Sequence, residues 1–184
     1  DPIIFDVGAN NGQSIEKFKR LFKSPIIHSF EPNPYETNSL IKNYGKEKNI
    51  FINNQALGDK DGKSEFNINA LSGHSSFKKL IPNTRWLKLR AKKMKLDARK
   101  YTVNQVISEI TTLDKYARKN KINRIDILKI DTQGYEDKVL QGAEKYLLQN
   151  KIHLIPENDN YQTQSFNLEE VKIQGKLKGI IRSY

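Results

Sequence analysis

The sequence contains no cysteine, and this absence excludes several kinds of site at once. Without thiols the chain has no disulfide framework, no cysteine nucleophile and no cysteine-ligated metal, and we assign no residue to a metal site. No apolar run is long enough to cross a bilayer, so we expect no membrane span. No stretch resembles a signal peptide, and the expected compartment is therefore the cytoplasm.

Acidic residues are scarce relative to basic ones, and the excess of basic residues is concentrated in one segment. The chain has 32 Lys and Arg residues against 21 Asp and Glu residues, a net charge of +11. Residues 78–100, the basic segment, hold ten Lys and Arg residues against one acid, or nine of the eleven net charges. This concentration indicates a local patch, and we interpret about 78–104 as a basic variable insertion.

The remaining pattern of the 184 residues is typical of one α/β domain. Short apolar, β-branched runs predict buried strands, and apolar residues at helical spacing follow several of them. This alternation predicts a doubly wound, mainly parallel sheet with helices on both faces. The runs that predict strands are 2–6, 26–30, 50–52, 125–130 and 152–155. An antiparallel strand at 64–69 after a hairpin turn at 59–62, a weaker strand at 103–110 and an edge strand at 179–184 are also expected.

Two helix starts are visible in the sequence. Asn10 or Asn11 is expected to cap the helix after the first strand. Asn33 is expected to cap the next helix, with Pro34 at its first position and Glu36 completing a capping box.

The first predicted strand leads into the turn Gly8-Ala9-Asn10-Asn11-Gly12. Glycines there allow a ligand to approach the main chain closely, next to the positive end of the following helix. We interpret the turn as a nucleotide-cofactor loop. It carries two glycines at a spacing that differs from G-x-G-x-x-G, which argues against an NAD-linked oxidoreductase.

Three carboxylates, Asp6, Glu31 and Asp131, lie at the ends of three predicted parallel strands. Each alone could cap a loop or face solvent, but ligands of open α/β sheets bind at this edge. Glu31 lies nineteen residues beyond Gly12, where an acid can accept hydrogen bonds from both ribose hydroxyls and exclude a 2′-phosphate. An adenosine-based cofactor is therefore expected.

Five motifs then follow one another in a recognisable order: residues 5–12, 30–34, 56–59, 112–114 and 128–136. In them the chain resembles the FkbM-type branch of the class I S-adenosylmethionine-dependent methyltransferases. The resemblance covers 3–77 and 107–155, and it departs at Gln133, where the family pattern has Glu.

The resemblance implies a Rossmann-like fold, S-adenosyl-L-methionine as cofactor, and O-methylation of a saccharide or other small acceptor. It implies a cofactor site made of Asp6, Gly8, Ala9, Asn10, Gly12, Glu31, Pro32, Ala56, Leu57 and Asp131.

A hydroxyl acceptor needs a group that takes its proton. The candidates are His74, Asp131 and Glu136, with His153 behind them. An unperturbed histidine titrates at about 6.5, but His74 could equally be an exposed loop residue. Glu136 could simply complement a helix dipole.

The basic segment allows three interpretations. It could be a solvated insertion, a clamp for an anionic acceptor, or a nucleic-acid site with Trp86 stacking on bases. The turn after Asp131 lacks the Asn/Asp-Pro-Pro-aromatic signature of amino-methylating nucleic-acid enzymes, which argues against the third. The alternative function is a non-catalytic module that holds an anionic partner between Lys78 and Lys100. The sequence does not indicate an oligomeric state.

Overall fold

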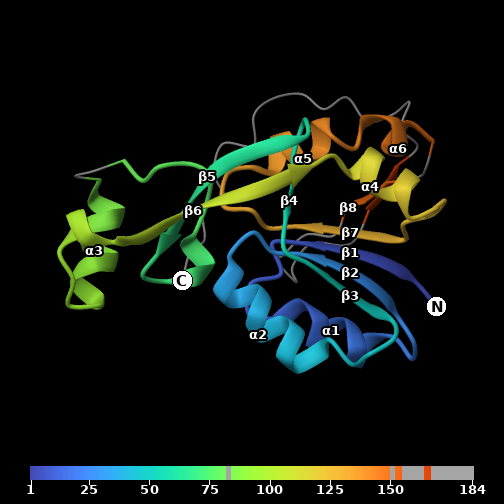
Figure 1. Cartoon of the computed structure of the whole chain (residues 1–184), viewed down its shortest axis with the longest axis horizontal. Coiled ribbons are helices and arrows are strands. Elements are labelled where there is room, and N and C mark those ends of the chain that lie inside the picture. The colour runs from blue at the N-terminus through green and yellow to red at the C-terminus, as the bar shows by residue number, and fades with distance from the viewer. Residues whose placement is uncertain (82–83, 150–151, 155–163, 167–184) are drawn as a thin grey trace.

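The computed structural model describes residues 1–81, 84–149, 152–154 and 164–166 (Figure 1). Its centre is a four-stranded sheet in the order β3–β2–β1–β7, and every pairing in it is parallel. The strands are β1 (Ile3–Val7), β2 (Ile26–Phe30), β3 (Ile50–Asn53) and β7 (Ile127–Ile130). The predicted α/β fold with a mainly parallel sheet is confirmed.

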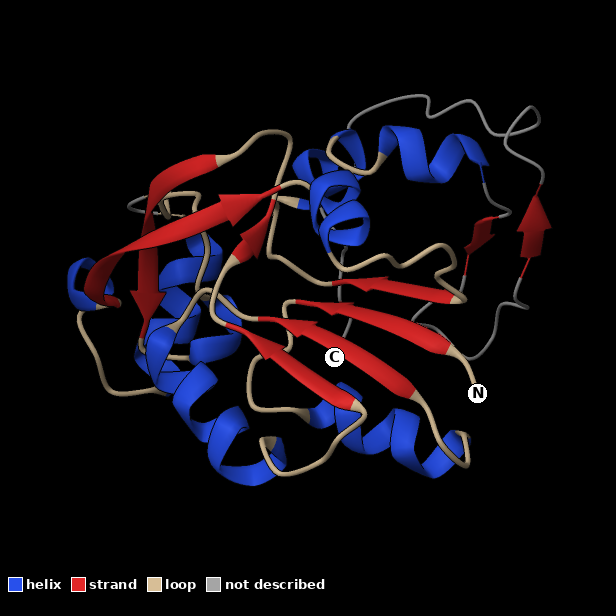
Figure 2. Ribbon diagram, turned by 45° about the vertical axis from the view of Figure 1, so that its right-hand side comes forward, coloured by secondary structure: helices blue, strands red, loops and turns tan. Residues whose placement is uncertain are grey.

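Helices cover both faces of this sheet (Figures 1 and 2). On one face lie α1 (Gln13–Leu21) and α2 (Pro34–Tyr44). On the other lie α4 (Leu113–Lys119), α5 (Glu136–Gln141) and α6 (Glu144–Gln149). The helical segment after residue 135 is divided between α5 and α6 at Gly142, where a Cβ would collide with the backbone of Gly58.

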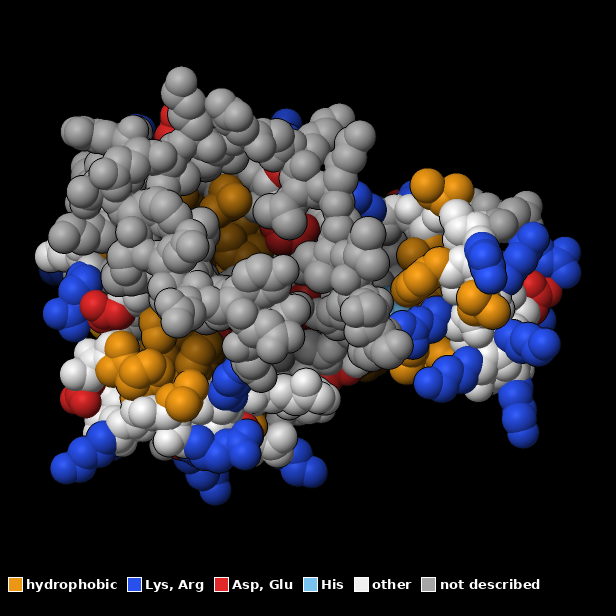
Figure 3. All heavy atoms as spheres, turned by 180° about the vertical axis from the view of Figure 1, so that it is seen from behind, with side chains coloured by type: hydrophobic (Ala, Val, Ile, Leu, Met, Phe, Trp, Pro, Cys, Tyr) orange, Lys and Arg blue, Asp and Glu red, His pale blue; other side chains and the backbone are white. Residues whose placement is uncertain are grey.

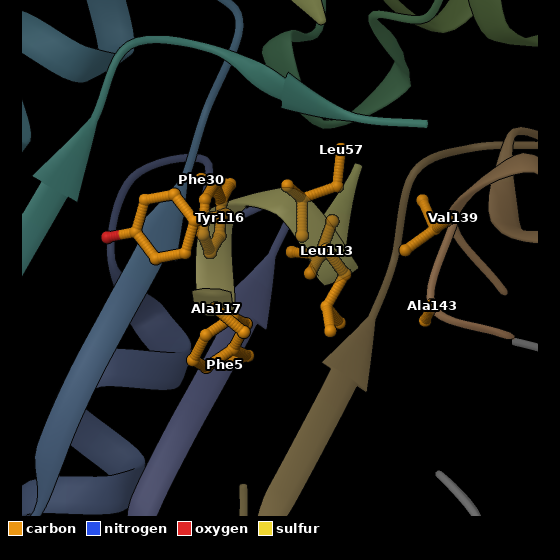
Figure 4. Close-up of a cluster of buried hydrophobic side chains, with 9 residues drawn as sticks. Phe5, Phe30, Leu57, Leu113, Tyr116, Ala117, Val139 and Ala143 are labelled. Carbon is orange, nitrogen blue, oxygen red and sulfur yellow. The ribbon is translucent and has the colours of Figure 1, made fainter. Parts of the chain in front are cut away.

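β1 supplies side chains to the cores on both faces because successive strand residues point to opposite sides. Ile4 packs with the residues of α1 and α2, whereas Phe5 and Val7 pack towards α4 and α5. Figure 4 shows the second core, in which the Phe5 ring lies 5.7 Å from the Tyr116 ring, edge to face. Its buried members are Phe5, Val7, Phe30, Leu57, Leu113, Tyr116, Ala117, Val139 and Ala143.

The start of α2 follows its sequence signal. Asn33 caps the helix by accepting a hydrogen bond from the Tyr35 N–H at 3.1 Å, and Pro34 takes the first position. The reciprocal bond expected from Glu36 is replaced, because the Asn33 N–H donates to Glu31 at 2.8 Å. The second strand and this helix are therefore joined by one carboxylate.

The start of α1 differs from the prediction. Its N-cap is Gly12, with φ at 89° and no side-chain cap, so the predicted cap by Asn10 or Asn11 is wrong. Asn10 is engaged elsewhere: its N–H donates to Glu31 at 2.7 Å, and its side-chain oxygen accepts from Ser72 at 3.0 Å.

A second sheet has the order β4–β6–β5. Its strands are β4 (Ala56–Leu57), β5 (Gly62–Asn69) and β6 (Thr102–Thr111). The predicted hairpin at 59–62 is wrong, because the strands before and after this turn, β4 and β5, do not pair with each other. They flank β6, which is parallel to β4 and antiparallel to β5.

β5 and β6 extend away from the parallel sheet and carry the basic segment at their far end (Figure 1). We call the described residues of 71–107 the arm. It contains η1 (Ser72–His74), α3 (Arg85–Lys93) and η2 (Ala98–Lys100). Leu87, Ala91 and Tyr101 form a small buried core there, so the basic segment is a folded unit with one covered face.

Beyond α6, β8 (Ile152–Leu154) pairs with β9 (Gln164–Phe166) as an antiparallel ribbon. The strand expected at 152–155 is therefore found over 152–154, in a sheet separate from the parallel one. The edge strand expected at 179–184 lies outside the described residues. Within the described part of the chain, no helix combines the length and apolar character needed to span a bilayer.

Candidate functional site

A cavity of about 440 Å³ opens where the parallel strands end. β1 lies between β2 and β7, so the strand order reverses direction at β1. Open α/β sheets bind ligands at such a point, beyond the carboxyl ends of the strands. The volume is in the range of small-molecule sites. Eight of the ten residues expected to bind a cofactor line it: Gly8, Ala9, Asn10, Glu31, Pro32, Ala56, Leu57 and Asp131.

Glu31 is the buried carboxylate of this cavity, with 5% of its surface exposed. One carboxylate oxygen accepts the Asn10 N–H at 2.7 Å, and the other accepts the Asn33 N–H at 2.8 Å. Burial raises the pKa of Glu31 to about 7, although both backbone N–H groups oppose the shift. A carboxylate has acceptor capacity beyond one bond per oxygen, so the oriented group can still accept hydroxyl donors.

Gly8 permits the close approach of two loops. Its φ is 82°, and a Cβ there would collide with the backbone carbonyl of Asp131. Its N–H donates to the Phe30 carbonyl at 2.9 Å. The turn after β1 is thus pressed between the ends of β2 and β7, and the main chain itself forms the cavity wall.

Asp6 is fully buried, and it is absent from the cavity lining. It therefore lies behind the wall that the turn after β1 forms. It lies opposite Lys129 in the β1–β7 register, with the Lys129 Nζ 3.0 Å from its Oδ1. The same Nζ donates to the Gly8 carbonyl at 2.9 Å. Burial raises the pKa of Asp6, and the Lys129 charge opposes the shift.

Lys129 does line the cavity, and sequence reasoning missed it. In the sequence it is a charge that interrupts an apolar strand. The available signal was a matching interruption in β1, since Asp6 and Lys129 are opposite charges that parallel pairing places side by side.

Gly12 is the other expected residue that the structure keeps away from the cavity lining. A Cβ on Gly12 would lie 2.8 Å from the Tyr44 ring and 3.0 Å from Leu40. The glycine therefore allows α1 and α2 to pack together, and its expected contact with a cofactor stays a prediction.

Asp131 ends β7 and lines the cavity on the side of Lys129. Its N–H donates to the Val7 carbonyl at 2.9 Å, and the Gln133 side-chain amide donates to its Oδ1 at 2.7 Å. Gln133 has φ at 56°, a left-handed conformation that turns its side chain back onto Asp131. The amide at the position of the family's Glu thus orients a carboxylate.

Glu136 closes the same turn from outside the cavity lining. Its carboxylate accepts the N–H groups of Thr132 and Gly134, each at 2.9 Å. This carboxylate is used to hold the loop that carries Asp131.

His74 is also outside the cavity lining, although its neighbours Ser72, Gly73 and Ser75 are part of it. Its Nδ1 lies 2.7 Å from the Tyr101 hydroxyl, and its ring centre lies 5.1 Å from that of Trp86. His74 therefore faces the core of the arm. His153 belongs to β8, and its side chain is outside the described part of the chain.

The loop 72–76 forms a wall that the sequence did not indicate. The Ser72 hydroxyl donates to Asn10 at 3.0 Å, and the Ser76 hydroxyl donates to the Gln133 carbonyl at 3.0 Å. One loop of the arm thus spans the turns after β1 and β7. Aromatic rings continue this wall along the cavity: Phe66, Phe77 and Tyr135.

The start of α1 completes the lining. Gln13, Ser14 and Lys17 face the cavity. Because Gly12 provides no side-chain cap, the first-turn N–H groups of α1 have no side-chain acceptor from the N-cap. Such a helix end favours an anionic ligand group.

Comparison with known proteins agrees with this geometry. The family model described as "Methyltransferase FkbM domain" matches residues 6–173. The chain belongs to the FkbM methyltransferase domain family. Among curated proteins it is similar to "2-O-methyltransferase NoeI" of Sinorhizobium fredii (strain NBRC 101917 / NGR234), with 23% identity over 155 residues. The match covers 83% of this chain and 61% of that relative, so the chain spans about three fifths of its length. No solved structure matches the chain significantly.

Proposed function

We propose that the protein transfers a methyl group from S-adenosyl-L-methionine to a hydroxyl of a saccharide or another small acceptor. The observation that carries the proposal is the Glu31 carboxylate, buried at the cavity wall and oriented by two backbone N–H groups. It stands beside the glycine turn at the edge of the sheet where cofactors of this fold class bind. Membership of the FkbM family supports the same reading.

The residues present fit such a cofactor. Glu31 can accept hydrogen bonds from both ribose hydroxyls, and Ala56 and Leu57 offer an apolar surface to the adenine. The uncapped start of α1 and Lys17 suit the carboxylate of the methionine part. When bound, the cofactor supplies an activated methyl group on a sulfonium, so transfer depends mainly on positioning.

Asp131 is the proposed acceptor of the hydroxyl proton. It lines the cavity, and Gln133 fixes the direction of its carboxylate. The other two candidates are engaged elsewhere, His74 with Tyr101 and Glu136 with the backbone of the 132–134 turn. Asp131 would then take the hydroxyl proton of the acceptor while the methyl group passes from the sulfonium sulfur to the oxygen, with the thioether S-adenosylhomocysteine as the leaving group.

The acceptor class is proposed from two supports. The relative NoeI is named a 2-O-methyltransferase, which favours oxygen as the methylated atom. Lys17 and Lys129 both line the cavity, but Lys129 is paired with Asp6, which leaves Lys17 to attract either the methionine carboxylate or an acidic group of the acceptor.

Isothermal titration calorimetry with S-adenosylhomocysteine tests the proposal. Wild-type protein should bind, and Glu31→Ala should bind at least roughly tenfold more weakly, because hydrogen bonds to a charged group are lost. Glu36→Gln is the matched control, since this carboxylate lies five residues further on and is absent from the cavity lining.

Absence of binding to the wild-type protein would contradict the methyltransferase proposal. It would leave the non-catalytic alternative, in which the basic segment holds an anionic partner on the same fold. In that case the affinity for the partner should fall with salt and should be insensitive to Glu31→Ala.

A further inference from the structure

The arm combines positive charge with exposed apolar side chains. Seven of the eleven exposed large hydrophobic residues of the described chain belong to it. Figure 3 shows both kinds of side chain next to each other on the lobe that α3 forms. The seven are Leu71, Ile81, Trp86, Leu89, Leu96, Val103 and Ile107.

The outer face of α3 has an apolar centre with cations around it. Leu87 and Ala91 are buried and define the inner face. Helix positions differ by about 100°, so Leu89 lies opposite those two residues. It is 58% exposed, and Lys88, Lys92 and Lys93 lie within about 100° of it around the helix axis.

Among the described residues, the lysines of α3 have no acidic partner. Within the described residues, the ion pairs of the basic segment are Arg99 with Asp97 and Lys79 with Glu65. None of the salt bridges found there involves the lysines of α3. This surface would therefore attract a partner with negative charge.

We propose that the arm docks the protein onto an anionic lipid surface. Basic side chains would lie among the headgroups, and exposed aliphatic chains such as Leu89 and Ile81, which is 72% exposed, would enter the interface. Anionic lipid bilayers bind protein surfaces that combine basic and exposed aliphatic side chains in this way. The inference does not depend on the methyltransferase proposal.

A nucleic acid fits this surface less well. Base stacking needs an open aromatic face, and although Trp86 is 43% exposed, the Arg90 guanidinium lies over its ring at 5.9 Å and the tilted His74 ring contacts it at 5.1 Å. Exposed Leu89 adds nothing to phosphate contacts. The apolar residues therefore favour lipid over a polyanion in solution.

Docking would hold the cavity close to the lipid. His74 joins Trp86 of α3 to the loop 72–76, and Ser72 and Ser75 of this loop line the cavity. The surface that binds lipid and one wall of the cavity thus belong to the same folded unit.

The tryptophan itself provides the test, because it is the only one in the sequence. Vesicles of phosphatidylcholine with phosphatidylglycerol should shift its emission to shorter wavelength and reduce quenching by acrylamide. Pure phosphatidylcholine vesicles should do neither. Co-sedimentation with the anionic vesicles should weaken as salt increases.

Two pairs of variants separate lipid docking from general attraction to anions. Leu89→Ala should weaken vesicle binding, whereas Leu21→Ala, which removes a 62% exposed leucine from α1, should not. Lys88→Gln with Lys92→Gln should weaken it roughly tenfold or more, unlike Lys42→Gln with Lys46→Gln on the body of the protein.

Equal emission with both kinds of vesicle would overturn the proposal. So would binding to anionic vesicles that Leu89→Ala leaves unchanged, and so would preferential binding to an RNA or DNA oligonucleotide, because each of these makes the exposed aliphatic side chains irrelevant.

Discussion

Glu31 is held in a position where ionisation is opposed by burial and assisted by two N–H groups. Burial dominates, so a group that an unfolded chain ionises near its ordinary pKa of 4.5 titrates at about 7 in the folded protein. Hydroxyl groups of a bound ligand would donate hydrogen bonds to this carboxylate and so offset the cost of its burial. The same shift makes the stability of the ligand-free protein depend on pH.

The sign of this dependence follows from the order of proton release. Between about 4.5 and about 7 the unfolded chain has lost the Glu31 proton and the folded chain has kept it. The free energy of unfolding should therefore fall as pH rises through this range, by roughly 3 kcal/mol from this residue.

Urea unfolding of wild type and Glu31→Gln at several pH values measures this contribution. The variant cannot ionise there, so its stability relative to wild type should improve as pH rises from about 4.5 to about 7. His28, whose pKa burial lowers to about 4, acts in the opposite direction and is present in both proteins, so it cancels in the difference. A difference that is constant with pH would contradict the assigned environment of Glu31.

At the scale of elements, β1 and β7 are joined by a charge pair as well as by backbone bonds. Lys129→Met should remove the cation and leave Asp6 buried without it, which destabilises the fold by about 3–5 kcal/mol. Lys63→Met, in an exposed pair with Glu109, should cost under about 1 kcal/mol. Chemical unfolding measures both.

Adding Asp6→Asn to Lys129→Met should recover part of the loss, because the buried charge is then removed as well. Equal stability of Lys129→Met and Lys63→Met would show that the pair does not hold the two strands together.

Elements with local signals could be predicted from sequence, and those that depend on distant partners could not. Asn33-Pro34 gave the start of α2 because capping involves neighbours in the chain. At Gly12 the deciding contact is with Tyr44, over thirty residues away, so a packing glycine could not be distinguished from a ligand-binding one. The strand order β4–β6–β5 was missed for the same reason, since its pairings join residues far apart in sequence.

The candidate site likewise has parts that local sequence signals predicted and parts that depend on distant contacts. Strand ends and turns place Glu31, Asp131 and the residues after Gly8 at one edge, which the sequence pattern indicated. The wall formed by 72–76 depends on hydroxyl bonds to Asn10 and Gln133, and a short polar loop carries no signal for such partners. The arm is therefore part of the site, although its sequence resembles an insertion.

For the whole molecule, the ends of the parallel strands and a loop of the arm line the cavity. The lobe that α3 forms carries a basic surface (Figure 3). Nine of the eleven net charges lie in the basic segment, residues 78–100, of that arm. The proposed attraction to an anionic surface involves the outer face of the arm, and Ser72, Gly73 and Ser75 of the same arm line the cavity.

A crystal structure with bound S-adenosylhomocysteine tests the central claim most directly. Both ribose hydroxyls should lie within hydrogen-bond distance of the Glu31 carboxylate, with the sulfur facing Asp131. A ligand bound with its ribose away from Glu31, or seated in the groove beside β3 instead of the cavity, would contradict the account.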